Sequence, residues 1–377
     1  MVVRVVLLVV ALVVAGWLLR WCWRLFRAVG LLVYLSRGMN SLLARLLYRI
    51  EVQVERYPHQ GSGLQPYKIY RPLARTVAPA LVIYHGATSY GEEHPALDNL
   101  ARALAHVGLL VFVPRLPTLK AVIIDKASMR SMSMFYRYIQ GYEGTCPGRI
   151  SVAGTSFAGG LLLKALLDQE MQQPAPRAVL VYGSYCDLET TLRFILTGTV
   201  KARGVEVTVA PDRWGQVIFF YNYLDHVPGS FDREAVRAVL GYYILDRVDQ
   251  GDAARAMLPS KERRLADLIL TPGNPESTAL AEKVLQHSRP VLEALSPSQF
   301  YPRIAFPFWI LHGRDDRMVP YTEALALKRL LPRQVRMHVS SLYSHKGLGN
   351  GGSLWRTLRE GVGLVVYVGR FLRAVEG

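Results

Sequence analysis

Apolar residues are unevenly distributed along the chain and divide it into two parts. The first part is dominated by a continuous apolar run, Val5 to Leu19, which is followed by a cluster of tryptophans and arginines. From residue 51 onward, short apolar runs alternate with segments of helical periodicity. Such short runs are typical of strands buried on both faces of a parallel sheet. The pattern therefore predicts an apolar N-terminal segment and a body of the α/β class.

Eight segments of the body are expected to be strands, and most of them are separated by amphipathic helices. Strands that alternate with helices form right-handed βαβ units, so the sheet should be mostly parallel, with the first two strands as an antiparallel edge. The expected strands are 50–57, 67–73, 80–86, 109–114, 149–154, 177–184, 306–313 and 334–340.

The long stretch 187–300 does not fit a single βα unit. Several of its segments have helical period, and a structureless loop of this length would be unusual. We expect it to be a helical cap inserted over the carboxyl edge of the sheet, where ligands bind in open α/β folds. The core of the body would then consist of 51–186 together with 301–377.

The N-terminal run has the features of a membrane anchor. Its fifteen apolar residues fall short of the roughly 20 needed to cross a bilayer, but the arginines at its two ends can extend it by snorkelling. Three tryptophans lie close to one end, as aromatic residues do at a membrane interface. We expect an uncleaved transmembrane helix over 1–30 and an amphipathic helix over 31–50. A cleaved signal peptide and a short second span are the alternatives.

The net charge of +16 adds to this picture. The first 50 residues contain seven arginines and no acidic residue. Arg20, Arg24 and Arg27 follow the apolar run at helical spacing, so they share one helix face that can contact lipid phosphates. Their position favours a single-pass membrane protein with a cytoplasmic body. The remaining positive charge is diffuse and accompanies no nucleic-acid motif, which argues against nucleic acid as a partner.

One short stretch, Gly154-Thr155-Ser156-Phe157-Ala158, has a composition that suits a catalytic serine. It lies where an expected strand turns into an expected helix. A nucleophilic serine at such a turn is lifted away from the backbone, and the tight turn tolerates only small residues beside it. Ala158 stands where the usual G-x-S-x-G pattern has glycine, and alanine still fits sterically. Gly154 is expected to support the turn.

A second turn is expected to complete an oxyanion hole. His85-Gly86 ends the expected strand 80–86 and would turn the chain so that the N–H of Ala87 faces the reacting carbonyl. The N–H of Phe157, at the amino terminus of the helix behind Ser156, would be the second donor.

An acid and a base follow the last two expected strands. Asp316 lies in "LHGRDDRMVP" and His345 lies in "HVSSLYSHKG". With Ser156 they occur in the order serine, aspartate, histidine, and all three fall at one edge of the sheet. A serine nucleophile needs a base to take its proton, and the base needs an acid to fix its tautomer. Asp315 and Asp187 are weaker candidates for the acid.

In this combination and order, the motifs resemble those of the α/β-hydrolase superfamily. The stretch "LVIYHGATSYGEEHPALDNLARALAHVGLLVFVPRLP" is similar to the dienelactone-hydrolase and prolyl-oligopeptidase-related esterase branches. The resemblance covers about 51–377, with the cap matching only in general kind. It implies a mostly parallel sheet flanked by helices, and a mechanism in which Ser156 attacks, His345 carries the proton and Asp316 orients His345.

We therefore expect a membrane-anchored serine hydrolase that cleaves carboxylic esters or related acyl bonds of a small-molecule or lipid-like substrate. An acyltransferase or a peptidase could use the same triad, and a non-catalytic membrane-bound binding or scaffold protein is the alternative from another class. The three cysteines and nine histidines show neither a disulfide framework nor a zinc spacing, so no metal and no cofactor are expected.

Overall fold

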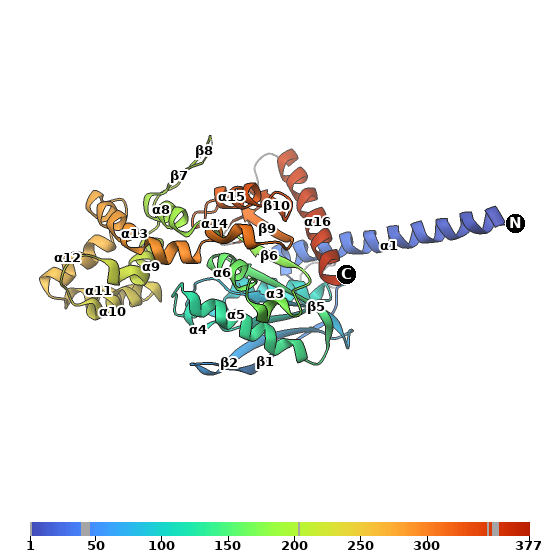
Figure 1. Ribbon diagram of the computed structural model, residues 1–377, viewed down its shortest axis with the longest axis horizontal. Helices are drawn as coiled ribbons and strands as arrows, with labels where there is room; N and C mark the ends of the chain where they lie inside the picture. The colour runs from blue at the N-terminus through green and yellow to red at the C-terminus, as the bar shows by residue number, and fades with distance from the viewer. Residues whose placement is uncertain (1, 39–45, 203, 345–346, 349–353) are drawn as a thin grey trace.

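The structure, a computed structural model, describes all residues except 1, 39–45, 203, 345–346 and 349–353. Its centre is a sheet of eight strands in the order β1-β2-β4-β3-β5-β6-β9-β10 (Figure 1). The strands are β1 (Ile50–His59), β2 (Gly63–Pro72), β3 (Ala78–Tyr84), β4 (Leu110–Pro114), β5 (Thr145–Thr155), β6 (Val179–Tyr182), β9 (Phe308–Gly313) and β10 (Val335–Ser340).

The sheet is mostly parallel, as the hydrophobic pattern predicts. β1 and β2 pair antiparallel, β2 pairs antiparallel with β4, and all remaining pairs are parallel. All seven residues of β3 are buried, because helices cover both faces of the sheet at its centre. The carboxyl ends of β3, β5, β6 and β9 therefore lie along a single edge.

Helices form a layer on each face of the sheet (Figure 1). One hydrophobic core includes side chains of α5 and α6, and a second core on the other face includes side chains of α1, α3 and α16. The helices outside the segment 187–300 are α1 (Val2–Arg37), α3 (Pro95–His106), α4 (Pro117–Lys120), α5 (Lys126–Tyr138), α6 (Phe157–Ala165), α7 (Gln169–Gln172), α15 (Thr322–Leu330) and α16 (Leu354–Glu376).

The segment between β6 and β9 is mostly helical and lies at the opposite end of the molecule from the free end of α1 (Figure 1). It also contains a two-stranded hairpin that we did not predict. Its elements are α8 (Leu188–Thr197), β7 (Thr199–Ala202), β8 (Val205–Thr208), α9 (Arg213–Tyr223), α10 (Arg233–Ile244), α11 (Val248–Ala256), α12 (Ser260–Ile269), α13 (Pro275–Leu295) and α14 (Pro297–Phe300).

The two ends of this helical segment meet at one junction beside the sheet. Asp187 caps α8 through the N–H of Thr190, and its other oxygen accepts a hydrogen bond of 2.7 Å from Ser298 Oγ. The buried hydroxyl of Ser296 accepts the N–H of Leu188 at 2.9 Å. The place where the chain leaves the sheet is thus bonded to the place where it returns.

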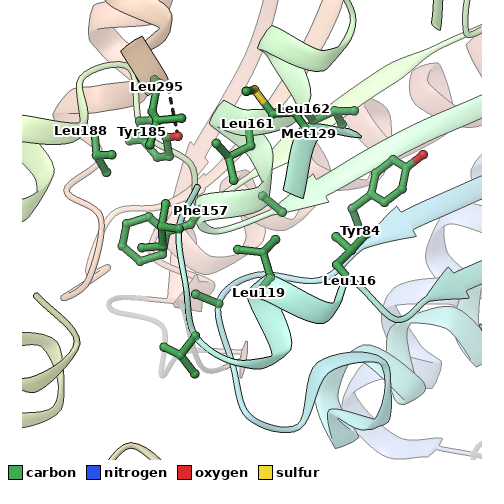
Figure 2. Close-up of a cluster of buried hydrophobic side chains, with 14 of the residues drawn as sticks. Tyr84, Leu116, Leu119, Met129, Phe157, Leu161, Leu162, Tyr185, Leu188 and Leu295 are labelled. Carbon is green, nitrogen blue, oxygen red and sulfur yellow. Dashed lines mark hydrogen bonds between the residues drawn. The ribbon is translucent and has the colours of Figure 1, made fainter. Parts of the chain in front are cut away.

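A buried carboxyl group from α15 joins the same junction. Oε2 of Glu323 accepts the backbone N–H groups of Cys186 and Asp187 at 2.9 and 2.8 Å. Tyr185, which is fully buried, donates its hydroxyl to the carbonyl of Leu295 at 3.2 Å (Figure 2). These bonds connect β6, α13 and α15, so the helical segment is fixed to the sheet.

The N-terminal helix differs from the two separate helices that we expected over 1–30 and 31–50. α1 runs without a break through Arg37 and ends at Gly38, whose φ of 60° suits the left-handed turn after a helix. β1 already begins at Ile50. The first part of α1 extends away from the body, whereas its last part packs against α16 and α3 (Figure 1).

The expected transmembrane helix is not supported. Among the residues that the structure describes, no helix combines the length and the apolar character that a bilayer crossing requires. The apolar run of α1 is short because Arg4 and Arg20 bound it, and Arg24 and Arg27 follow in the next turns.

Candidate active site

Ser156 lies at the turn between β5 and α6, and its backbone is strained. Its φ of 53° and ψ of −131° are rare for a residue with a side chain and cost on the order of 1–3 kcal/mol. The Ser156 N–H donates to the carbonyl of Tyr182 at 2.8 Å, and the Ser156 carbonyl accepts the N–H of Gly159 at 3.0 Å. Hydrogen bonds to β6 and to the first turn of α6 therefore hold the serine in a conformation that it would not adopt alone.

Small residues around Ser156 are required by close packing. A Cβ atom on Gly154 would lie 2.8 Å from the Cα of Gly159, and one on Gly159 would lie 2.5 Å from Ser184 Oγ. A Cβ atom on Gly160 would overlap the ring of Tyr185. Gly154, which we expected to support the turn, lies where β5 and α6 are in close contact.

The His85-Gly86 turn lies directly against the serine. A Cβ atom on Gly86 would be 2.8 Å from the Cβ of Ser156 and 3.5 Å from its Oγ. The Gly86 N–H donates to Thr155 Oγ1 at 3.1 Å, and Thr155 Oγ1 donates to the carbonyl of Tyr84 at 3.3 Å. Thr155 therefore ties the two turns together, a role that nothing in its sequence position indicates.

His85 holds the same turn and is a neutral structural residue. Its Nε2 accepts the N–H of Leu116 at 3.0 Å, so the ring proton lies on Nδ1, which donates to the carbonyl of Gly86 at 2.8 Å. Complete burial lowers the pKa of His85 to about 4, against an opposing contribution from its bond to Gly86. The ring is thus uncharged at neutral pH and is already bonded on both nitrogens.

Two backbone N–H groups at these turns are available as hydrogen-bond donors. Phe157 is the first residue of α6, where N–H groups have no partner within the helix. Among the hydrogen bonds of the described residues, none is donated by the N–H of Ala87 or of Phe157. These are the two donors that we expected for an oxyanion.

A cluster of buried apolar side chains packs against the turn that carries Ser156. Phe157 is almost fully buried, and Figure 2 shows it near other apolar side chains from β3, α4 and α6. The labelled members of this cluster are Tyr84, Leu116, Leu119, Met129, Phe157, Leu161, Leu162, Tyr185, Leu188 and Leu295. Since packed interiors resist displacement, the cluster fixes the direction of the first turn of α6.

Asp316 and Asp315 follow β9 but have different surroundings. Asp315 is exposed, whereas Asp316 is only 2% exposed. Oδ1 of Asp316 accepts the N–H groups of Met318 and Val319, both at 2.9 Å, and the neighbouring ring of His312 lies 3.8 Å from Oδ2. Of the two carboxyl groups, only that of Asp316 is buried and held in a fixed orientation.

Asp187, another candidate for the acid, and His312 both have structural partners. His312 Nε2 donates to the carbonyl of Val319 at 2.9 Å, which shapes the turn that carries Asp316. Asp187 caps α8. His345, the predicted base, lies outside the described residues. Its sequence neighbours Tyr343–Ser344 form β11, which packs against β9, the strand that leads to Asp316.

The hydroxyl of Tyr182 is close enough to Asp316 to feel its negative charge. Burial and then the negative charge of Asp316 raise the pKa of the Tyr182 hydroxyl, so this group stays protonated. The described residues contain no cluster of histidine, cysteine and carboxylate side chains that could hold a metal ion.

Comparison with known proteins places the chain by its fold. No family model matches the sequence, and no curated protein matches it. Among solved structures, the chain is similar to an acylaminoacyl peptidase from Pyrococcus horikoshii, with a TM-score of 0.50, 12% identity, and coverage of 89% of this chain but 44% of the peptidase. Weaker similarities include carboxyl esterase 2 from Tuber melanosporum (TM-score 0.45, 13% identity, 87% and 88% coverage) and Est1E from Butyrivibrio proteoclasticus (0.47, 12%, 86% and 99%). From its strand order and this similarity, the chain has the α/β-hydrolase fold.

Proposed function

We propose that the protein is a serine hydrolase that cleaves carboxylic esters or related acyl bonds through Ser156, His345 and Asp316. The observation that carries the proposal is the strained backbone of Ser156, which lies between two turns with available N–H donors. Backbone strain of this kind persists where the surroundings impose it, and it is concentrated at functional sites.

The proposed reaction proceeds through an acyl-enzyme. Ser156 Oγ attacks the carbonyl carbon while His345 removes the hydroxyl proton, and the N–H groups of Ala87 and Phe157 bind the oxyanion. The intermediate collapses, the bond to the alcohol breaks, and His345 protonates the departing oxygen. Water, deprotonated by His345, then attacks the acyl group, and the carboxylic acid leaves as Ser156 regains its proton. Asp316 orients His345 and stabilises its charged form.

We further propose that α1 attaches the hydrolase to a membrane and that the substrate is apolar. The support is the set of large apolar side chains that the first half of α1 exposes, which includes Leu12, Val13, Trp17 and Leu19. A contiguous exposed apolar surface of this kind marks a protein or membrane contact. Flotation with phosphatidylcholine–phosphatidylglycerol vesicles should recover the wild type, and much less of a variant with Leu12→Ser and Leu19→Ser. Equal flotation would contradict this attachment.

Labelling with a fluorophosphonate probe tests the nucleophile. We expect the purified protein to be labelled, Ser156→Ala to lose the label, and Ser89→Ala to keep it, since Ser89 lies in the loop after β3 and does not have the positive φ of Ser156. Hydrolysis of p-nitrophenyl esters of increasing acyl length, beside a set of peptide amides, would then separate esterase from peptidase activity. A folded wild type that is neither labelled nor active would favour the non-catalytic binding protein.

A further inference from the structure

The turn that carries Ala87, one of the two proposed oxyanion donors, is hydrogen-bonded to α4 and to the residue before it. The N–H of Thr88 donates to the carbonyl of Leu119 in α4 at 3.1 Å. Leu116, which precedes α4, donates its N–H to Nε2 of His85 at 3.0 Å. The chain is thus bonded to this short helix both before and after Ala87, so a shift of α4 would move the donor.

Leu119 connects α4 to the surroundings of both proposed donors. Its carbonyl holds the residue after Ala87, and its fully buried side chain belongs to the apolar cluster that contains Phe157 (Figure 2). The same carbonyl accepts a second N–H, that of Val122, also at 3.1 Å. One acceptor is therefore shared between the oxyanion turn and the turn that follows α4.

Val122 lies in the turn after α4 with a backbone conformation that valine rarely adopts. Its φ is 59°, and its side chain is fully buried in the core. A β-branched residue in the left-handed region is an outlier, because its Cβ crowds the neighbouring backbone. Such a conformation persists only where the surrounding structure imposes it. The turn therefore depends on partners that hold it in place.

Asn222, from α9 in the segment between β6 and β9, is such a partner. Its Nδ2 donates to the carbonyl of Val122 and its Oδ1 accepts the N–H of Ile124, both at 2.9 Å. Nδ2 also donates to the carbonyl of Ile218, one turn earlier in α9, at 2.9 Å. A single amide group therefore binds the strained residue on its carboxyl side and joins the turn to α9.

The other end of α9 lies against the turn that carries Asp316. A Cβ atom on Gly215 would overlap the side chain of Ile195 and would lie 3.5 Å from Cε of Met318. The N–H of Met318 is one of the two that Asp316 accepts. Contacts that do not involve Asn222 therefore fix α9 beside the acid, and Asn222 extends this fixed position to the turn after α4.

We propose that Asn222 is a positioning residue for the oxyanion hole and fixes the N–H of Ala87. It acts through the turn at Val122 and then through the carbonyl of Leu119. The proposal rests on the hydrolase function proposed above. The full oxyanion charge is absent from the bound ester and develops on the way to the tetrahedral intermediate, in acylation and in deacylation alike. A displaced donor should therefore lower kcat and leave KM nearly unchanged.

Steady-state hydrolysis of a p-nitrophenyl ester by the full-length protein tests this role. Asn222→Leu keeps the branched shape but removes the amide. Asn222→Asp keeps an acceptor for the Ile124 N–H and loses the donor to Val122. kcat is taken per active site labelled to completion by the fluorophosphonate, so that unfolded molecules are not counted. We expect kcat to fall by at least about tenfold in both variants, with KM within about twofold of the wild type.

Inhibition by a trifluoromethyl ketone gives a second readout, which a purely structural role would leave unchanged. Ser156 Oγ adds to the carbonyl carbon of the ketone, and His345 takes the hydroxyl proton. No group leaves, so the adduct retains its oxyanion. We expect the inhibition constant to rise in both Asn222 variants by about the factor by which kcat falls.

Gln216→Met is the matched control on the same helix. The Gln216 amide donates to the carbonyl of Ile269 and to Ser277 Oγ, both at 2.7 Å, and these partners lie within the segment between β6 and β9. Losing these buried bonds should lower the midpoint of urea unfolding. kcat per active site and the inhibition constant should both stay at the wild-type values.

Three outcomes would overturn the role of Asn222. They are an unchanged kcat in either folded variant, a loss that appears in KM alone, and a fall in kcat without a change in the inhibition constant. With a labelled and active wild type, each of these leaves the hydrolase function standing. A folded wild type that is neither labelled nor active would instead overturn the hydrolase function and, with it, the role of Asn222.

Discussion

Replacing Glu323 by glutamine should remove a destabilisation that develops as the pH rises from about 4.5 to 7. Glu323 is 3% exposed, and burial raises its pKa from 4.5 to about 7, although the N–H groups of Asp187 and Cys186 oppose the rise. The folded chain therefore binds this proton more tightly than the unfolded chain does. Below pH 4.5 both states are protonated, and the stabilisation is complete.

As the pH rises from 4.5 to 7, the unfolded chain releases the proton while the folded chain retains it, so stability is lost. A difference of about 2.5 pKa units at roughly 1.4 kcal/mol each corresponds to a loss on the order of 3 kcal/mol for this buried group. Above pH 7 the carboxyl group is ionised in both states, and its contribution no longer changes.

Urea unfolding followed by far-UV circular dichroism at a series of pH values would measure this loss. In Glu323→Gln, the amide oxygen can still accept both N–H groups of the junction, but the side chain cannot titrate. The free energy of unfolding of the wild type should therefore fall relative to that of the variant by about 3 kcal/mol as the pH rises from 4.5 to 7. Glu234→Gln, an exposed glutamate in the first turn of α10, is the matched control and should follow the wild type. The reasoning fails if Glu323→Gln retains the wild-type slope.

Two substitutions test the candidate active site itself. Gly86→Ala would place a methyl group 2.8 Å from the Cβ of Ser156, and a displacement of this size should lower kcat for ester hydrolysis by about 100-fold; a loss below threefold in a folded variant would refute the close contact. Asp316→Asn should lower kcat by up to about 10⁴-fold, because an amide cannot stabilise a charged histidine. Asp315→Asn, at the exposed neighbour, should leave kcat nearly unchanged. If Asp315→Asn instead lowered kcat and Asp316→Asn did not, Asp315 would be the acid.

The sequence predicted the strands well because the central strands β3 and β4 are uninterrupted apolar runs and most of the others are largely apolar between polar loops. Their order across the sheet could not be predicted, since it depends on contacts between distant residues. The β7–β8 hairpin was missed within a region of helical period, although Gly204, with a φ of 80°, marks its turn and the residues beside it alternate. The continuous α1 was also missed, because Gly30 does not interrupt the helix and permits contact with Leu47.

The candidate site was predictable only where local chemistry signals it. The small residues beside Ser156 are visible in the sequence because the turn itself demands them. The sequence alone cannot distinguish the environments of Asp315 and Asp316, which differ through burial and through two N–H donors supplied by the fold. The pairing of Arg27 with Glu376 joins opposite ends of the chain, and it replaces the prediction that Arg27 faces lipid from an exposed helix surface.

The hydrogen bond between Ser298 and Asp187 closes the base of the helical segment between β6 and β9. The two ends of this segment are therefore in contact at the sheet, and their positions do not depend on how long the segment is. Each doubling of a flexible loop costs only about 0.6 kcal/mol in closure entropy. The segment could thus lengthen, shorten or exchange its helices over evolutionary time with little effect on the sheet. Changes in this segment, those at Asn222 excepted, can then accumulate separately from changes in the turns that hold Ser156.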